Sequence, residues 1–271
     1  MSPNHRPATI VMTATITPRE GMPDSVRNDP KIRLDDSRRA LEFYLSLPNS
    51  LVDRILFLEN SSSDLSVLRR VVESLEHDKK VEFNSFTGDY QPEFGKGYGE
   101  FQMLDYGLSE CRFLSKADVV WKVTGRHRVL NLSRLIETAP QDYTVYCDLR
   151  SIPFIGGDFN LQAVPFIGKR LGEKYRNQFM DLRVFSCTVD GYDRLLRNQY
   201  LQMWNQMPEK FLFDVMFKAK RQEKRIVPRF RIQPQIAGYA GWDNADYQSL
   251  SYKIKDSFRA AMRLVMPGFW V

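Results

Sequence analysis

Two cations flank a glycine in the segment Lys122-Val123-Thr124-Gly125-Arg126. The apolar run 119–121 leads into this segment, so we expect a buried strand that ends where the cations begin. The lysine is a compact charge and the arginine a planar fork, and together they suit a diphosphate and the negative charge that develops on a leaving group. The pattern predicts an anion site at a strand end. The alternative is an ordinary cationic surface loop.

A carboxylate and a further cation follow the next apolar run, in Tyr146-Cys147-Asp148-Leu149-Arg150. An aspartate at a strand end can hold a divalent cation, Mn²⁺ or Mg²⁺, that bridges a nucleotide diphosphate. One acid is a poor metal site, so either another acid such as Asp158 completes it or Arg150 supplies the positive charge itself. A plain salt bridge between Asp148 and Arg150 is the third interpretation, and the spacing leaves all three open.

Two acids lie in the helix that we expect from Pro208 to about Lys218. Asp214 stands among apolar positions, where burying a carboxylate is costly unless it has a partner or a role. We therefore expect Asp214 to be the base that deprotonates an acceptor hydroxyl. Glu209, in the first turn, is the second catalytic candidate, against the simpler interpretation that it only complements the helix dipole.

Two further segments have residues suited to a nucleotide. Glu59-Asn60-Ser61 begins a loop rich in hydroxyls and carboxylates, which can bind ribose or a base edge and can equally cap the next helix. Glycines at 95, 97 and 99, with Lys96 among them, let the backbone approach a phosphate at a helix N-terminus. Their spacing is neither a P-loop nor a dinucleotide fingerprint, so a flexible connector is the competing interpretation.

Strand-like and helix-like segments alternate along the chain. Candidate strands are 8–16, 53–58, 81–86, 119–121, 143–147, 183–189 and 226–232. Candidate helices are 35–47 with Asp35 or Asp36 as its cap, 65–75, 95–108, 132–136, 192–206, 208–218 and a last one ending near Met266. This alternation predicts an α/β fold with a mostly parallel central sheet flanked by helices.

The composition fits one large domain with an anionic partner. The 271 residues are 43% hydrophobic and carry a formal net charge of +6, which suits nucleotide phosphates, an acidic membrane surface or nucleic acid. The three cysteines lack metal-ligand spacing and predict a reducing compartment. Since no apolar run approaches the roughly 20 residues that span a bilayer, we expect a cytoplasmic protein, either soluble or peripheral at the inner face of the membrane.

The C-terminal segment joins basic and apolar residues at helical spacing. Lys253, Lys255, Arg259 and Arg263 alternate with Phe258 and other apolar side chains. Such a helix can lie in the interface of an anionic membrane, which would make that membrane a partner. The simpler interpretation is a helix that packs on the domain with its cations in water.

Six segments in this order resemble bacterial GT-A glycosyltransferases of surface polysaccharide synthesis, of the capsule or O-antigen type. They read FLEN, GKGYGE, KVTGRHRVLN, VYCDLR, RVF and FLFDVMF, and the resemblance extends from the first strand to about Phe217. It implies a Rossmann-like GT-A domain, with a nucleotide-sugar-binding half at 1–150 and an acceptor-side half at 151–271 that ends in the basic helix. The Asp-Leu-Arg in place of the family's DxD motif leaves the usual metal dependence open.

The resemblance also implies roles for individual residues. The nucleoside would meet Thr15, Thr17 and Glu59-Asn60-Ser61, and the diphosphate and donor sugar would meet Lys122, Arg126 and Asp148. The remaining donor-binding positions are Lys96, Thr124, Asn131 and Arg150. Asp214 falls where the family tends to have a glutamate, which leaves its catalytic role open.

The implied activity is a hexosyltransferase that moves a sugar from a nucleotide-sugar, first of all a UDP-sugar, to a hydroxyl of a saccharide or lipid-linked glycan. A nucleotidyltransferase is the first alternative, but it needs a glycine-rich basic loop straight after the first strand, and 15–19 fits this poorly. A non-catalytic module for nucleic acid is the second. It predicts cations interleaved with aromatics along one element, so we expect no nucleic-acid partner.

Overall fold

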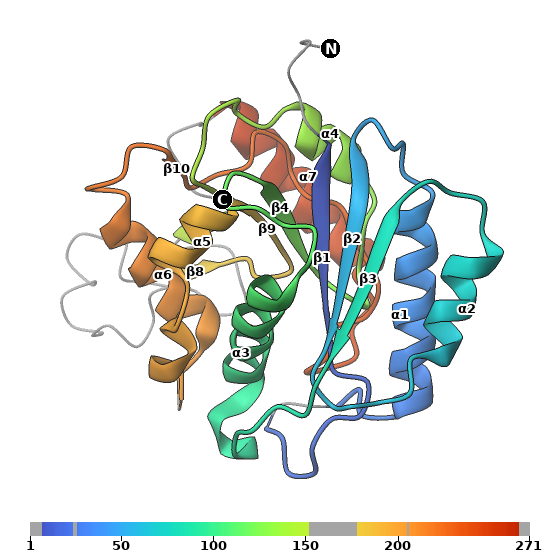
Figure 1. Ribbon diagram of the computed structural model, residues 1–271. Coiled ribbons are helices and arrows are strands. Elements are labelled where there is room, and N and C mark those ends of the chain that lie inside the picture. Colours follow the sequence, from blue (N-terminus) through green and yellow to red (C-terminus); the bar gives the residue numbers. More distant parts are fainter. Residues whose placement is uncertain (1–6, 24–25, 152–177, 205, 266–271) are drawn as a thin grey trace.

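A seven-stranded sheet forms the centre of the computed structural model, which describes residues 7–23, 26–151, 178–204 and 206–265 (Figure 1). Its strand order is β10-β6-β9-β4-β1-β2-β3. Strand β9 is antiparallel to both of its neighbours, and all other pairs are parallel. The fold is therefore α/β with a mostly parallel central sheet flanked by helices, which confirms the predicted class.

The strands of the central sheet are β1 (Ala8–Ala14), β2 (Val52–Glu59), β3 (Lys80–Ser85), β4 (Val119–Thr124), β6 (Val145–Tyr146), β9 (Val184–Thr188) and β10 (Ile226–Val227). Two small sheets pair β5 (Arg128–Val129) with β11 (Ile236–Ala237) and β7 (Leu149–Ser151) with β8 (Gln178–Met180). The α-helices are α1 (Pro30–Leu45), α2 (Ser66–Ser74), α3 (Gly95–Glu110), α4 (Leu132–Glu137), α5 (Val189–Leu195), α6 (Pro208–Ala219) and α7 (Leu250–Val265). The described 3₁₀ helices include η1 (Pro92–Phe94) and η4 (Gln199–Gln202).

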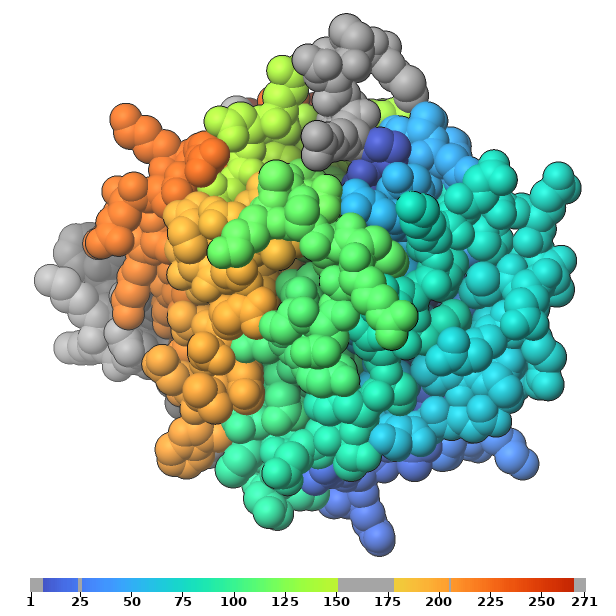
Figure 2. All heavy atoms as spheres, in the orientation of Figure 1, coloured from blue at the N-terminus to red at the C-terminus, as the bar shows by residue number. Residues whose placement is uncertain are grey.

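Helices cover both faces of the sheet, and each face has its own apolar core. Alternate residues of β1 point to opposite faces: Ile10 and Met12 pack with α1, α2 and α4, whereas Val11 packs with α3, α5 and α6. Figure 2 shows the second face, where α3 (green) separates the α5–α6 region (yellow to orange) from the first strands and α2 (cyan). The sheet is thus buried between two helical layers.

The strand order reverses at β1, which lies between β2 and β4. In open α/β sheets, ligands bind outside the carboxyl ends of the strands at such a reversal. Thr15 follows β1 there, Glu59 ends β2, and Gly125 follows β4. The topology therefore brings three of the predicted segments to one edge of the sheet.

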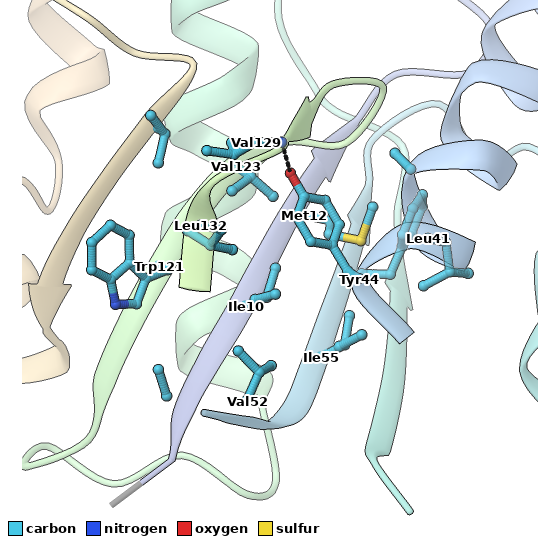
Figure 3. Close-up of a cluster of buried hydrophobic side chains, with 14 of the residues drawn as sticks. Ile10, Met12, Leu41, Tyr44, Val52, Ile55, Trp121, Val123, Val129 and Leu132 are labelled. Carbon is cyan, nitrogen blue, oxygen red and sulfur yellow. Dashed lines mark hydrogen bonds between the residues drawn. The ribbon is translucent and has the colours of Figure 1, made fainter. Parts of the chain in front are cut away.

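A buried tyrosine of α1 holds the turn after β4. The Tyr44 hydroxyl donates to the carbonyl of His127 at 2.8 Å and accepts from the amide of Val129 at 3.0 Å. Figure 3 shows this ring among Ile10, Met12 and Leu41 and its hydrogen bond to Val129. Because these bonds hold the residues that directly follow Arg126, the apolar core helps to position a candidate site residue.

Two predicted helices differ from the observed ones. Helix α1 begins at Pro30, capped by Asp29, rather than at Asp35 or Asp36. Its first three residues are exposed, so they add nothing to the apolar periodicity, although proline is well suited to the first position. The predicted helix 192–206 is divided into α5 and η4, and Asn198 between them has φ 62°, a left-handed conformation that asparagine tolerates and that ends a helix.

The C-terminal ends of two predicted strands differ most from the observed ones. Strand β4 continues to Thr124, so Lys122 lies inside the strand and is buried rather than following it. Strand β10 contains only Ile226–Val227 instead of 226–232, because Pro228 comes next and a proline has no amide to donate to a ladder. The predicted starts of α3 and α6, at Gly95 and Pro208, are confirmed.

Candidate functional site

Lys122 is buried on the α3 side of the sheet and forms an ion pair there. Its Nζ lies 2.6 Å from Oε1 of Glu100, on the second turn of α3. Thr13 of β1 donates its hydroxyl to the same oxygen at 2.7 Å. Glu100 therefore joins β1, β4 and α3 below the carboxyl ends of the strands. Sequence reasoning missed it, although it closes the glycine-rich segment that begins α3.

Arg126 lies in a tight turn that Gly125 makes possible. The Gly125 amide donates to the carbonyl of Thr13 at 2.7 Å, and a Cβ at this position would lie 2.9 Å from that carbonyl oxygen. The half-buried Arg126 side chain passes close to Gly241, and its Nε donates to the carbonyl of Tyr239 at 3.4 Å. Burial lowers the pKa of Arg126 below its ordinary value. The turn thus holds a guanidinium group whose loss of hydration is only partly offset by its hydrogen bond to a carbonyl.

Arg33 of α1 is a second such guanidinium, and sequence reasoning did not select it. It donates to the carbonyls of Thr15 and Arg27, and is half-buried. Burial and the positive charge of Arg126 lower its pKa to about 10. In the described part of the chain, neither Arg33 nor Arg126 has a carboxylate within 4 Å. No sequence pattern pointed to Arg33, since it becomes important only through its position beside Arg126.

The loops after β1 and β2 are held together by polar side chains. Glu59 is fully buried and accepts from the amides of Ile16 and Ser61, at 3.1 and 3.0 Å. The Thr15 hydroxyl donates to Oδ1 of the Asn60 side chain at 2.7 Å, and the Thr17 amide donates to the Ser61 hydroxyl at 3.0 Å. The five predicted nucleoside-binding residues therefore lie together beside the switch point, where Glu59 organises the loops.

The two acids of α6 have very different surroundings. Asp214 is exposed, so the expectation that it lies among buried positions was wrong: it falls on the solvent side of a helix whose Leu212, Phe213 and Met216 face the core. Glu209 is half-buried at the start of the helix. Burial raises its pKa, and the negative charges of Glu100 and Asp181 raise it further. Of the two acids, Glu209 is the one at the site.

Close packing of two helix starts brings Glu209 to the site. A Cβ on Gly97 of α3 would lie 2.3 Å from Cβ of Pro208 in α6. Only a glycine permits this approach. The charges of Glu100 and Lys122 both act on the pKa of Glu209. A half-buried carboxyl group with a raised pKa is suited to accept a proton near neutral pH.

Asp148 lies in a buried ionic network. Its carboxylate accepts two hydrogen bonds from Arg263 of α7, at 2.8 and 2.6 Å, and one from Arg150 at 3.2 Å. Arg150 also pairs at 2.8 Å with Asp181, which pairs with Arg183 at 2.5 Å. Burial would raise the pKa of Asp181, but the charges of Arg183 and Arg150 outweigh it and hold the pKa far below its ordinary value.

These contacts do not fit a divalent cation at Asp148. Both carboxylate oxygens face guanidinium groups, so a cation there would meet the positive charges of Arg150 and Arg263. Asp158, considered as a second ligand, lies outside the described residues. Within the described ranges, no group of three or more His, Cys, Asp or Glu side chains is arranged to hold a metal ion.

The other predicted donor-binding residues have varied positions. Asn131 connects β5 to the segment before β11, donating to the carbonyl of Gln233 and accepting from the amide of Gln235, both at 2.9 Å. Thr124 ends β4 at 3.4 Å from Lys122 Nζ. Lys96 is exposed on the first turn of α3. Thr124 therefore lies at the switch point, whereas Asn131 stabilises the turn behind it.

An open hollow of about 530 Å³ lies beside this cluster. Arg27 and Tyr239 line it, and the Arg27 guanidinium covers the Tyr239 ring at 4.5 Å. Arg27 also pairs with Asp36 at 2.6 Å. Arg126 contacts Tyr239 and Arg33 contacts Arg27, so each of these two lining residues touches one arginine of the candidate site.

No protein-family model matches this sequence. No curated protein sequence matches it either. Similar solved structures include mouse xyloside xylosyltransferase 1 in its apo form, with TM-score 0.47, 11% identity, and 82% of this chain and 85% of that chain covered. The 4-diphosphocytidyl-2C-methyl-D-erythritol synthase of Anaerococcus prevotii has TM-score 0.46 and 10% identity, with 93% and 98% covered.

The inositol-1-phosphate CTP transferase of T. maritima has TM-score 0.43 and 15% identity, and the match covers 83% of this chain and 85% of that chain. The activities named for these three structures belong to those proteins. What this chain does is therefore inferred from its own site.

Proposed function

We propose that the chain is a nucleotide-sugar-dependent glycosyltransferase of the hexosyltransferase type. The observation that carries the proposal is the pair of half-buried guanidinium groups, Arg33 and Arg126, at the switch point of the sheet. Burying positive charge without a counterion is costly. A bound diphosphate would supply the missing negative charge, and arginine forks match phosphate geometry.

In this proposal, the donor diphosphate lies across the carboxyl ends of β1 and β4. Arg126 and Arg33 bind its phosphates and stabilise the charge that develops on the departing nucleoside diphosphate. Lys122 adds a third positive charge, which it shares with Glu100. Thr15, Thr17, Asn60 and Ser61 face the nucleoside, with Lys96 and Thr124 as further donor contacts.

The acceptor reacts on the α6 side of the site. Glu209 takes the proton of an acceptor hydroxyl, the hydroxyl oxygen bonds to the anomeric carbon of the donor, and the bond from that carbon to the diphosphate breaks. The raised pKa of Glu209 suits it to this role better than Asp214, which is exposed. The acceptor class, a saccharide or lipid-linked glycan of surface polysaccharide synthesis, rests on the family resemblance.

The Asp148 carboxylate binds the guanidinium groups of Arg150 and Arg263 in place of a metal ion. Asp148 and Arg150 form part of the network that positions Arg183 and α7, and the proposal uses no metal at this position. The experiments are therefore run with and without added metal ions, and neither Mn²⁺ nor Mg²⁺ has a role in the proposed mechanism.

Donor hydrolysis tests this function. The purified chain is incubated with a panel of UDP- and GDP-sugars, in EDTA and with Mn²⁺, and release of nucleoside diphosphate is measured. We expect release from one nucleotide class, with UDP first, and its loss in Arg126→Ala. The control is Arg39→Ala, which removes an exposed cation of α1 and should leave release unchanged.

Three outcomes would overturn the assignment. Near-normal turnover of Arg126→Ala would remove the proposed donor site. Release of pyrophosphate from a nucleoside triphosphate and a sugar phosphate would instead show a nucleotidyltransferase. Stabilisation of the chain by single-stranded RNA but not by UDP would indicate a nucleic-acid module.

A further inference from the structure

Helix α7 buries charged side chains and exposes apolar ones, which is the reverse of an ordinary surface helix. Its two buried residues are both arginines, Arg259 and Arg263. Arg263 binds Asp148, the carbonyl of Phe230 at 2.8 Å and the side chain of Gln233 at 2.9 Å. These contacts fix the rotation of the helix about its axis, so its opposite side must face away from the domain.

That opposite side is apolar. Leu250, Ile254 and Phe258 recur every four residues and are 74, 61 and 50% exposed, and Leu264 and Val265 are 82 and 75% exposed. A surface helix normally turns such residues toward the core. An exposed apolar stripe on this scale marks an interaction surface. We call these five residues the α7 stripe.

The charges around the α7 stripe restrict its partner. At about 100° per residue, Lys253 and Lys255 lie on opposite flanks of the stripe, and both are exposed. Asp256 is the only acid of α7, and it lies on the buried side, where it contacts Arg259 and Gln233. The outward side of α7 is thus mostly apolar in the middle, where Ser257 is the exposed polar residue, and positive at both edges.

We propose that α7 lies in the surface plane of an anionic lipid bilayer, with the α7 stripe among the acyl chains and the two lysines at the headgroups. Apolar side chains flanked by lysines are the pattern of an in-plane membrane helix. A symmetric dimer through the α7 stripe would instead bring the lysines of two copies close together, and the outward side of α7 has no acid to pair with them.

This contact goes beyond sugar transfer and does not require a membrane-crossing segment. Within the described residues, no helix combines the length and apolarity that crossing a bilayer requires. Sixteen residues lying flat extend about 24 Å along a membrane surface. The chain would therefore rest on the bilayer through α7, with the ionic network of Asp148 holding the helix in place.

Vesicle sedimentation with the full chain tests the proposal. We expect binding to phosphatidylcholine vesicles that contain phosphatidylglycerol, little binding to pure phosphatidylcholine, and release by salt. The double variant Ile254→Gln with Phe258→Gln should bind at least about tenfold more weakly. Lys253→Gln and Lys255→Gln should each weaken binding about fivefold. Leu75→Gln, which changes an exposed apolar residue outside α7, should bind normally.

Folding and donor binding serve as controls, because the substituted side chains point outward and lie outside the donor site. The variants should keep the melting temperature and the UDP affinity of the parent chain. Absence of vesicle binding, or full binding by the double variant, would overturn the proposal. So would a doubled mass in light scattering that the double variant abolishes, since it would assign the α7 stripe to a second copy.

Discussion

At the scale of single residues, the site depends on which carboxylates already have hydrogen-bond or ion-pair partners within the protein. Glu59 accepts hydrogen bonds from backbone amides, and Asp36 forms an ion pair with Arg27. Glu100 forms an ion pair with Lys122 and accepts a hydrogen bond from Thr13. These commitments leave Arg33 and Arg126 with carbonyl partners but no ion pair in the described part of the chain. A cation in this condition lowers the stability of the ligand-free protein and raises its affinity for an anion.

Arg33→Gln should weaken binding of a nucleoside diphosphate roughly 10- to 100-fold, the loss expected for a charge-assisted hydrogen bond. The melting temperature of the ligand-free chain should not fall, since the substitution removes a half-buried charge that has carbonyl partners but no ion pair among the described residues. Isothermal titration with UDP measures the affinity. Arg39→Gln on the same helix is the control and should bind normally, because Arg39 is exposed and pairs with Asp35. Equal effects of the two substitutions would contradict the assignment of Arg33.

Glu209→Gln should lower transfer at least about 100-fold while leaving UDP affinity within a factor of about two. The amide has nearly the same shape but cannot accept the proton. Asp214→Asn is the matched control on the same helix, and its turnover should stay near that of the parent because Asp214 is exposed. The reverse pattern, in which Asp214→Asn is inactive, would move the base to Asp214.

The pKa shift of Glu209 also predicts a pH dependence of stability. Its pKa in the folded chain is raised above the ordinary value of 4.5, so the folded state binds this proton more tightly than the unfolded chain does. Stability from this group is therefore present at low pH and is lost as the pH rises from 4.5 through the folded pKa. Glu209→Gln should remove that loss, which urea unfolding across this pH range would measure. A steeper loss in the variant would contradict the shift.

At the scale of elements, the site is assembled by contacts between segments that are far apart in the chain. Helix α1 holds the turn after β4 through Tyr44, and α3 admits the start of α6 through Gly97. Neither contact touches the proposed ligand. Each nevertheless decides where a charged side chain lies, so each predicts a functional effect of a remote substitution.

Tyr44→Phe should reduce the free energy of unfolding by about 2 kcal/mol, because the His127 carbonyl and the Val129 amide both lose a buried partner. It should also weaken UDP binding, since the loosened turn carries Arg126. Chemical denaturation and titration measure the two effects. Tyr143→Phe is the control: it removes a buried hydroxyl bonded to Ser186 at 2.6 Å and should cost stability with no change in UDP affinity. Equal UDP affinities of the two variants would show that α1 does not position the donor site.

Gly97→Ala should force the start of α6 away from α3, because the new methyl group would overlap Pro208. We expect transfer to fall about tenfold or more as Glu209 is displaced, while the donor side keeps its UDP affinity. Steady-state kinetics and titration separate the two. Gly95→Ala provides a comparison, since that position has no atoms within 4 Å and its cost comes from its φ of 83°. A loss of UDP affinity in Gly97→Ala would contradict the division of roles.

At the scale of the whole molecule, local pattern was enough to predict the class of fold. Apolar runs such as 53–58, followed by the helical spacing of Leu65, Leu68 and Val72, identified the parallel β-α units. The antiparallel direction of β9 was not predictable, because a buried strand has the same composition in either direction. The break at Asn198 depends on a single backbone angle, which periodicity does not reveal.

The site was only partly predictable for a related reason. The turn at Gly125 and Arg126 was visible because glycine and charge interrupt an apolar run. Arg33 was not, because its importance comes from a neighbour 93 residues away in the sequence, Arg126. The environment of Asp214 was wrongly predicted because neighbours in a helical sequence point in different directions, and this acid faces solvent.

The most direct test of the account is thermal unfolding with saturating UDP in EDTA, for the parent chain and Arg126→Ala. At a concentration about 100 times the dissociation constant, ligand binding contributes about 2.7 kcal/mol, which should raise the melting temperature of the parent chain by about 5 °C. We predict this shift without metal and its loss in Arg126→Ala. A shift that requires Mn²⁺, or one that Arg126→Ala retains, would contradict a donor site built from arginines.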